Sequence, residues 1–193
     1  PAATMASLLW SNYSDDSIIF YEHVTWWIAL GLILGFLPYF PYSKHAHLFM
    51  GPLNYMVPDH KKSMASIETI NFEDDSIEQY GAGQLQHLPQ SQLLDAYACI
   101  QCSRCQDACP AYETGKELSP SALEINKRYF LNTHLDEFIE GSIPDASITD
   151  ILLTDEAAWS CTTCGFCVEV CPVGNEPMVD ILRARQDLVM MES

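Results

Sequence analysis

All eight cysteines of this 193-residue chain fall into two matching runs. The first reads Cys99-Ile-Gln-Cys102-Ser-Arg-Cys105-Gln-Asp-Ala-Cys109-Pro110, and the second reads Cys161-Thr-Thr-Cys164-Gly-Phe-Cys167-Val-Glu-Val-Cys171-Pro172. Each run has the spacing C-x2-C-x2-C-x3-C-P, in which three thiolates can surround three corners of an iron–sulfur cubane along one tight loop. The fourth cysteine is expected to open a helix, because the proline after it suits the first helical position.

Structural zinc and disulfides are the alternative uses of clustered cysteines. Zinc sites usually take cysteines in separated pairs, often with histidine, and a third cysteine this close does not suit a tetrahedron. Disulfides belong to oxidising compartments, and cysteines within one short loop bridge poorly. The doubled run therefore predicts two [4Fe-4S] clusters as the cofactors.

The same spacing predicts which cysteines share a cluster. In two-cluster proteins with this run, the fourth cysteine of each run ligates the cluster of the other run. We therefore expect cluster 1 to be bound by Cys99, Cys102, Cys105 and Cys171, and cluster 2 by Cys161, Cys164, Cys167 and Cys109.

The chain is strongly acidic, with 26 Asp and Glu against 9 Lys and Arg and a formal net charge of −17. This charge excludes nucleic acid as a partner bound through its phosphates. It favours docking on a basic surface of a partner protein. Cysteines used as cluster ligands indicate a reducing compartment, most simply the cytoplasm.

An uncharged apolar stretch, VTWWIALGLILGFLPYFPY, covers residues 24–42. As a helix with a rise of ~1.5 Å per residue, it comes close to the ~30 Å hydrocarbon core of a bilayer. Trp26 and Trp27 lie near one end, as in an aromatic belt, and Pro38 is expected to end the helix at the other. We predict one transmembrane helix over residues 23–43; a buried core helix is the alternative.

Basic residues predict the orientation of this span. No Lys or Arg precedes Lys44, and Lys61 and Lys62 follow it. The positive-inside rule then places the ferredoxin-like part on the cytoplasmic side of the cytoplasmic membrane. The expected organisation is an N-terminal extracytoplasmic segment (1–22), a transmembrane helix (23–43), an interfacial segment with an acidic linker (44–90), and a two-cluster domain (91–193).

Lys44, His45 and His47 directly follow the predicted span. The simpler interpretation is an anchor at the membrane surface with solvated histidines. The alternative is that His45 and His47 line a quinone site. Haem held by this span alone is not expected, because no histidine lies inside the apolar stretch as an axial ligand.

Helices are predicted on both sides of the cysteine runs. Ser91 is expected to cap a helix that leads into the first run, and Thr149 one that leads into the second. Ser119, followed by proline, is expected to cap a helix that ends near Thr133. Apolar periodicity predicts a final amphipathic helix over 177–191. The expected fold is mainly α, with one transmembrane helix and an α-helical two-cluster ferredoxin domain.

Residues 97–120, YACIQCSRCQDACPAYETGKELSP, and residues 157–172, AAWSCTTCGFCVEVCP, resemble the two halves of a helical ferredoxin module. This module occurs in membrane-bound iron–sulfur oxidoreductases related to the D-type polypeptide of heterodisulfide reductase and to the glycerol-3-phosphate dehydrogenase anchor subunit. The resemblance covers residues 25–191. It implies electron transfer between a dehydrogenase-type partner and a membrane quinone pool. Such proteins often continue into cysteine-rich CCG domains with a catalytic cluster, and no CCG occurs in this sequence.

We therefore expect a membrane-anchored electron-transfer subunit of a respiratory chain, with oxidoreductase subunits, membrane lipid and a quinone such as menaquinone as partners. A hydrogenase, a flavoprotein dehydrogenase and an electron-transferring flavoprotein are all compatible electron donors. No catalytic residue is expected, because the sequence contains no nucleophile–base motif, phosphate loop or dinucleotide fingerprint. The alternative is the N-terminal part of a larger iron–sulfur oxidoreductase whose CCG domains are missing from this chain.

Overall fold

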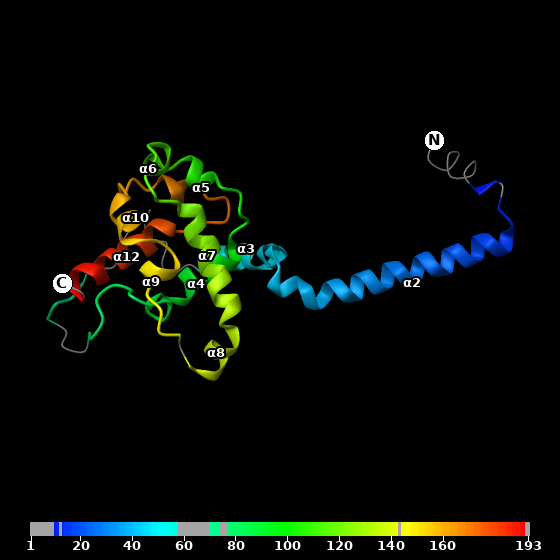
Figure 1. Cartoon of the computed structure of the whole chain (residues 1–193), viewed down its shortest axis with the longest axis horizontal. Coiled ribbons are helices and arrows are strands. Elements are labelled where there is room, and N and C mark those ends of the chain that lie inside the picture. The colour runs from blue at the N-terminus through cyan, green and yellow to red at the C-terminus, as the bar shows by residue number, and fades with distance from the viewer. Residues whose placement is uncertain (1–9, 12, 58–69, 74–76, 143, 192–193) are drawn as a thin grey trace. The chain divides into compact units, whose positions relative to one another are not determined.

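The computed structural model describes residues 10–11, 13–57, 70–73, 77–142 and 144–191. The chain divides into two units, Pro1–Ser43 and Lys44–Ser193. Across the described ranges every regular element is a helix, as Figure 1 shows. The predicted mainly α fold class is therefore confirmed.

The first unit is built around α2 (Asp15–Tyr39), a helix of 25 residues. Its N-cap is Ser14, whose hydroxyl accepts a hydrogen bond from the backbone N–H of Ser17 at 3.4 Å. Two acidic residues in the first turn are favourable at the positive end of the helix dipole. The helix thus begins at Asp15 and not near residue 23, because these acidic residues open the helix instead of forming a separate segment.

Helix α2 is long and apolar enough to cross a bilayer. At ~1.5 Å per residue it extends about 37 Å, more than the ~30 Å hydrocarbon core. None of its side chains is buried, and neighbouring residues such as Leu32 and Ile33 are more than half exposed. A core helix would bury one apolar stripe, so this pattern favours a membrane anchor. Pro38 lies in its last turn, and the 3-10 helix η1 (Phe40–Tyr42) follows.

The second unit consists of short helices joined by loops (Figure 1). Helix α4 (Gln90–Ala98) leads into the first run, and α10 (Asp155–Ser160) leads into the second. The other elements are η2 (Lys44–Ala46), α3 (His47–Met56), η3 (Leu85–His87), α5 (Arg104–Asp107), α6 (Pro110–Glu113), α7 (Pro120–Thr133), α8 (Leu135–Glu140), α9 (Ile148–Ile151), α11 (Phe166–Glu169) and α12 (Pro177–Met190).

Helix α7 is the element on which the second unit packs. Helices α4, α5, α9 and α12 all contact it. The core contains fully buried apolar side chains from separate parts of the chain, including Leu118, Leu123, Ile148 and Ile181. Burial of such side chains is the main stabilising contribution, and it holds the loops that follow each helix in place.

Two of the predicted helices are confirmed by the structure. The Ser119 hydroxyl accepts a hydrogen bond from the backbone N–H of Ala122 at 3.1 Å, and α7 ends at Thr133 as expected. Helix α12 covers Pro177–Met190, within one residue of the predicted range. In both helices a proline occupies the first position, where its missing N–H is harmless.

Two predicted caps are wrong. Ser91 lies buried inside α4, which begins after Pro89. Thr149 lies inside α9, whose N-cap is Ser147. The helix that leads into the second run is a separate one, α10, capped by Thr154. Thr149 stands close to Ser147, a hydroxyl in the better position to cap α9, whereas α4 begins after Pro89 without a side-chain cap.

Helix α3 was not predicted. It occupies the segment expected to be interfacial, and its sequence HLFMGPLNYM contains both Gly51 and Pro52, which disfavour a helix in isolation. Packing against α4 compensates for this weak propensity. Within the predicted acidic linker, residues 58–69 and 74–76 lie outside the described residues.

Candidate iron–sulfur site

The two cysteine runs have matching backbones. In the first run Gln101 and Ser103 have positive φ values of 56° and 62°. In the second run Thr163 and Gly165, at equivalent positions, have φ values of 54° and 79°. Positive φ is uncommon for residues other than glycine and marks backbone held in place by its surroundings. Each left-handed pair is followed at once by a short helix, α5 or α11, which carries the third cysteine of its run.

The fourth cysteines differ between the runs. Cys109 directly precedes α6, whose first residue is Pro110, as predicted. Cys171 is followed by a turn at Pro172, and the next helix begins only at Pro177. The expectation that each fourth cysteine opens a helix is therefore correct for the first run and wrong for the second.

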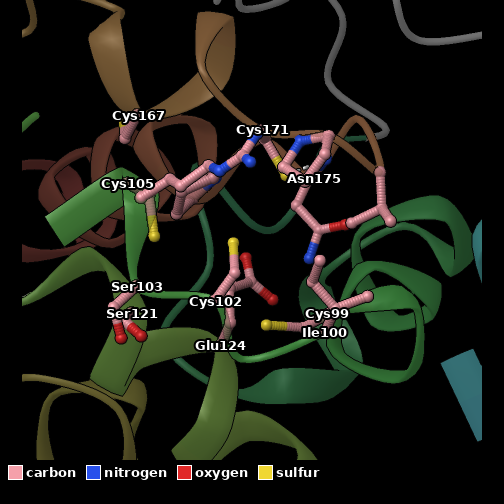
Figure 2. A pocket seen from close by; sticks show the side chains of 14 residues that line it. Cys99, Ile100, Cys102, Ser103, Cys105, Ser121, Glu124, Cys167, Cys171 and Asn175 are labelled. Atoms are coloured by element: carbon pink, nitrogen blue, oxygen red, sulfur yellow. Dashed lines mark hydrogen bonds between the residues drawn. The ribbon is translucent and has the colours of Figure 1, made fainter. Parts of the chain in front are cut away.

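Four cysteines from both runs line one pocket: Cys99, Cys102, Cys105 and Cys171. Figure 2 shows their side chains around a common space, with Glu124 on the same wall. Cys167 also borders this pocket, and in Figure 2 it lies near Cys105 at the margin of the view. The structure thus brings Cys171 to the first run, which is 62 positions or more away along the chain.

The remaining cysteines form a second group. The pKa of Cys167 is raised to about 12 by burial and further by Cys161, Cys109 and Cys164. Burial also raises the pKa of Cys161, with Cys109 and Cys164 again among the causes. Cys109 therefore lies near Cys161 and Cys167 of the second run. Cys167 also raises the pKa of Cys105, so it lies close to the first group as well.

Burial also makes the ionised, metal-binding form of these thiols costly when no metal is bound. It raises the pKa of Cys99 to about 11 and that of Cys105 to about 12. Backbone N–H groups act in the opposite direction: Asn175 donates to Cys171 Sγ at 3.3 Å, and Thr163 donates to Cys161 Sγ at 3.4 Å. A buried thiolate without a counter-charge is costly, so the ionised form required for ligation is coupled to metal binding. The N–H···S bonds are contacts of the kind that tune cluster potentials.

In each run, one arginine donates a hydrogen bond to the backbone carbonyl oxygen of the first cysteine. Arg185 donates to Cys161 O at 2.5 Å and to Ala158 O at 2.8 Å, and its guanidinium lies 5.2 Å from the Trp159 ring centroid. Arg128 repeats this arrangement more loosely, with 3.4 Å to Cys99 O and 5.9 Å to the ring centroid of Tyr97.

These arginines were missed in the sequence, although a signal was present. Tyr97 and Trp159 each stand two residues before the first cysteine of a run, and Arg128 and Arg185 each stand eight residues after a helix-opening proline. Aligning the two halves of the module would have revealed both pairs. The module is therefore an internal repeat in which helix, loop and arginine recur together.

We expect Arg185→Lys to destabilise the second cysteine group more than Arg128→Lys destabilises the first. Lysine retains the charge but cannot bridge two carbonyl oxygens as a guanidinium does. Hydrogen bonds to charged groups contribute about 1.5–3 kcal/mol, so loss of this bridge should accelerate release of iron to a chelator. The rate of bleaching of each cluster's spectroscopic signal measures the effect. Equal rates in the two variants would show that the shorter contacts of Arg185 have no special role.

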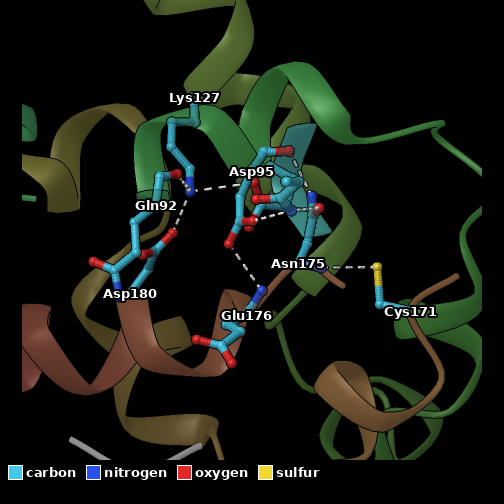
Figure 3. A network of polar contacts seen from close by, with 9 residues as sticks. Gln92, Asp95, Lys127, Cys171, Asn175, Glu176 and Asp180 are labelled. Carbon is cyan, nitrogen blue, oxygen red and sulfur yellow. Dashed lines mark hydrogen bonds and ion pairs between the residues drawn. The ribbon is translucent and has the colours of Figure 1, made fainter. Parts of the chain in front are cut away.

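A buried polar network lies behind the first pocket (Figure 3). Lys127 is fully buried, ion-pairs with Asp180, lies 3.2 Å from Glu124 Oε2, and donates to Gln92 O at 3.0 Å. Asp95 accepts from the backbone N–H of Glu176 at 3.0 Å. The network therefore connects α4, α7 and α12, the helices that frame the pocket.

The network contains more acid than base. Burial raises the pKa of Glu124 to about 8 and that of Asp95 to about 6, while Lys127 opposes both shifts. Burial alone would lower the pKa of Lys127, but Asp180, Glu124 and Asp95 together raise it, so its ammonium stays charged. The equivalent residues of Glu124 and Lys127 in the second half are Ile181 and Ala184, so this charged arrangement belongs to one half of the repeat alone.

The two histidines after the span do not line this pocket. His47 Nδ1 lies 2.6 Å from Lys44 O, within its own first turn. Neither His45 nor His47 lines the pocket of the first cysteine run.

Comparison with known proteins agrees with this geometry. Residues 95–175 match the family described as 4Fe-4S dicluster domain. The chain is 37% identical to the "Probable iron-sulfur-binding oxidoreductase FadF" of Bacillus subtilis, over 91% of this chain and 29% of that protein. It is 28% identical to the "EtfAB:quinone oxidoreductase" of Syntrophomonas wolfei, over 100% of this chain and 30% of that protein. The "Probable membrane-anchored ferredoxin" of Chromohalobacter salexigens is 32% identical, over 53% of this chain and 18% of that protein.

The chain spans less than a third of the length of each of these relatives. No solved structure matches it. The matched domain and the eight cysteines show that its cofactors are two [4Fe-4S] clusters. They also confirm the resemblance to membrane-bound iron–sulfur oxidoreductases that the sequence motifs indicated. The match to the 4Fe-4S dicluster domain covers residues 95–175, a range that includes all eight cysteines.

Proposed function

We propose that this chain is a membrane-anchored subunit that relays electrons between a partner oxidoreductase and the membrane quinone pool. The observation that carries the proposal is the meeting of Cys171 with Cys99, Cys102 and Cys105 at one pocket, which unites the two runs in a single folded unit. When bound, the clusters take up and release single electrons. The chain itself supplies burial, N–H···S bonds and buried charge, which are the means by which a protein sets cluster potentials.

The proposed ligand sets cross between the runs. Each set combines three closely spaced cysteines with the fourth cysteine of the other run. The pocket lining supports the first set, and the influence of Cys109 on the pKa of Cys161 and Cys167 supports the second. The sets are Cys99, Cys102, Cys105 and Cys171 for cluster 1, and Cys161, Cys164, Cys167 and Cys109 for cluster 2.

Quinone as the membrane partner is supported by two observations. Helix α2 has the length and composition of a bilayer span. One relative is named as an EtfAB:quinone oxidoreductase, and that name also favours a flavoprotein as the electron donor of this chain. The relatives are named as oxidoreductases, which supports other oxidoreductase subunits as partners.

A second proposal is that the chain is the N-terminal part of a larger iron–sulfur oxidoreductase. The observation that favours it is the greater length of the relatives, of which the chain covers less than a third. In that case the two clusters would feed a catalytic centre carried by the rest of the protein. Both proposals assign the same relay function to residues 95–175.

Electron delivery to quinone can be tested in vesicles. The full chain with both clusters is reduced photochemically in vesicles with and without menaquinone. Menaquinone should accelerate reoxidation of the clusters by about tenfold or more, because it offers an acceptor dissolved beside the anchor. Reoxidation by ferricyanide controls for competent clusters. Equal reoxidation with and without menaquinone, alongside rapid ferricyanide oxidation, would contradict the quinone proposal.

The same assay tests the two histidines. If His45 and His47 line the quinone site, the double variant His45→Ala/His47→Ala should slow quinone-dependent reoxidation about tenfold while ferricyanide oxidation is unchanged. An unchanged quinone rate would leave these residues as part of the surface anchor.

The proposed orientation has its own test. With no Lys or Arg before Lys44, the N-terminus should lie outside and residues 44–193 inside. Protease added to right-side-out vesicles should leave the cluster domain intact, whereas inverted vesicles should lose it. Cleavage between residues 58 and 76 in right-side-out vesicles would contradict this orientation and indicate the opposite one.

A further inference from the structure

Helix α3 has two chemically different faces. Leu48, Phe49, Leu53 and Met56 are 44% to 73% exposed, while Gly51 and Asn54 on the opposite side are buried. The exposed positions before and after Leu53 lie three to five residues from it, so they form one side of a helix. We call these four side chains the apolar face of α3. No Asp, Glu, Lys or Arg occurs anywhere in α3, although the whole chain carries a net charge of −17.

The buried face of α3 holds the loop that follows Cys171. Asn54 Nδ2 donates to Val173 O at 3.1 Å and to Asp95 Oδ1 at 2.6 Å. Tyr55 Oη donates to Pro172 O at 2.9 Å. A Cβ added at Gly51 would lie 3.5 Å from a Val173 methyl group, so the helix backbone itself approaches this loop.

This loop is the one that supplies a cysteine to the first pocket. Pro172 and Val173 line that pocket together with Cys171 and Cys99. Asn175, which contacts Asn54, donates its backbone N–H to Cys171 Sγ. Helix α3 is therefore attached to the pocket of Cys99, Cys102, Cys105 and Cys171.

The chain also limits how far α3 can lie from Tyr42, the last residue of η1. Helix α3 begins at His47, five positions after Tyr42, the last residue of η1. Even a fully extended chain covers at most about 3.6 Å per residue, so this connection spans no more than about 18 Å. If α2 crosses the bilayer, the start of α3 is thereby confined to the region of the membrane surface.

We propose that the apolar face of α3 lies in the interfacial layer of the lipid bilayer, which makes the pocket of Cys99 and Cys171 the one nearer the membrane. This inference deepens the proposed function and rests on α2 being a membrane anchor. An uncharged helix with one apolar face suits the headgroup–acyl boundary, whereas the acidic remainder of the domain is repelled by anionic lipid. The position of the apolar face of α3 thus determines which cluster lies close enough to the bilayer to exchange electrons with a lipid-dissolved quinone.

The direct test is photocrosslinking from the apolar face. p-Benzoylphenylalanine is placed at Leu53, or at Ile139 as a matched control, in the full chain with both clusters in phosphatidylglycerol-containing nanodiscs. Ile139 on α8 is even more exposed, at 75% against 44%, so exposure alone predicts more lipid adducts there. We expect about tenfold more phospholipid adduct from position 53. Equal adducts at both positions, or only protein adducts at position 53, would overturn the proposal, the latter in favour of an apolar protein partner.

A second measurement identifies the nearer cluster. A lipid with a gadolinium-chelating headgroup accelerates electron-spin relaxation of nearby paramagnets. The cluster that Cys99→Ser perturbs should relax faster in such nanodiscs than the cluster that Cys161→Ser perturbs, and Leu48→Glu/Leu53→Glu should reduce this difference. Equal relaxation of both clusters would overturn the inference. Neither measurement uses quinone, so lipid contact without quinone-dependent reoxidation would contradict the proposed function and leave the docking of α3 intact.

Discussion

Replacing Cys171 with serine should damage the cluster that Cys99→Ser damages and spare the cluster that Cys161→Ser damages. The reason is spatial: Cys171 lies at the pocket of Cys99, although it belongs to the second run. Serine is a far poorer ligand for iron than a thiolate, so the [4Fe-4S] signal of that cluster should be largely lost or altered. Electron paramagnetic resonance of the reduced variants measures each cluster separately.

The matched comparison for this result is Cys167→Ser. Cys167 stands four residues before Cys171 and borders the same pocket near Cys105, yet its own pKa is raised by Cys161, Cys109 and Cys164. Its replacement should affect the other cluster. If Cys171→Ser and Cys167→Ser damage the same cluster, each run binds its own cluster and the crossed sets are wrong. Crossed sets also predict that losing either cluster loosens the whole domain, because each cluster joins both runs.

Lys127→Met should lower the free energy of unfolding of the cluster-loaded protein by about 3–5 kcal/mol. Methionine fills a similar volume but leaves Asp180 and Glu124 buried without their cation. Uncompensated buried charge is among the most destabilising single changes in proteins. Denaturant titration in detergent, followed by helical circular dichroism, measures the loss.

Lys116→Met is the matched control, because Lys116 is exposed and the same chemical change should have little effect there. Lys127→Met/Asp180→Asn should recover part of the loss, since one uncompensated carboxylate is then removed. A Lys127→Met protein as stable as the parent would show that the acidic groups are neutral in the folded protein and need no cation.

The cysteine spacing predicts the cofactors because it is a local property. Ligands three positions apart lie within one loop, and a proline just beyond them limits how the chain continues. The same locality made the Ser119 cap and the ends of α7 and α12 predictable. The uncharged stretch around Trp26 and Trp27 was likewise sufficient to predict a helix of membrane-spanning length.

Other features could not be predicted because their causes are distant in sequence. Lys127 and Glu124 on an amphipathic helix resemble solvent-facing residues until Asp180, more than fifty positions later, is found beside them. Helix α3 contains glycine and proline and is stabilised by contacts with α4 and the Cys171 loop. The Thr149 cap failed because two neighbouring hydroxyls, Ser147 and Thr154, have the better local geometry.

By itself the sequence determined that this chain binds two [4Fe-4S] clusters in helical surroundings and carries an apolar helix, since each depends on residues close together in the chain. Only the tertiary structure decided which half of the repeat contains the buried ion network and which pocket α3 contacts. These depend on the packing of α3, α4, α7 and α12, and burial raises the cost of any unpaired charge or unfilled contact far above its cost in water. Residues without a local signature therefore acquire their roles only in the folded protein.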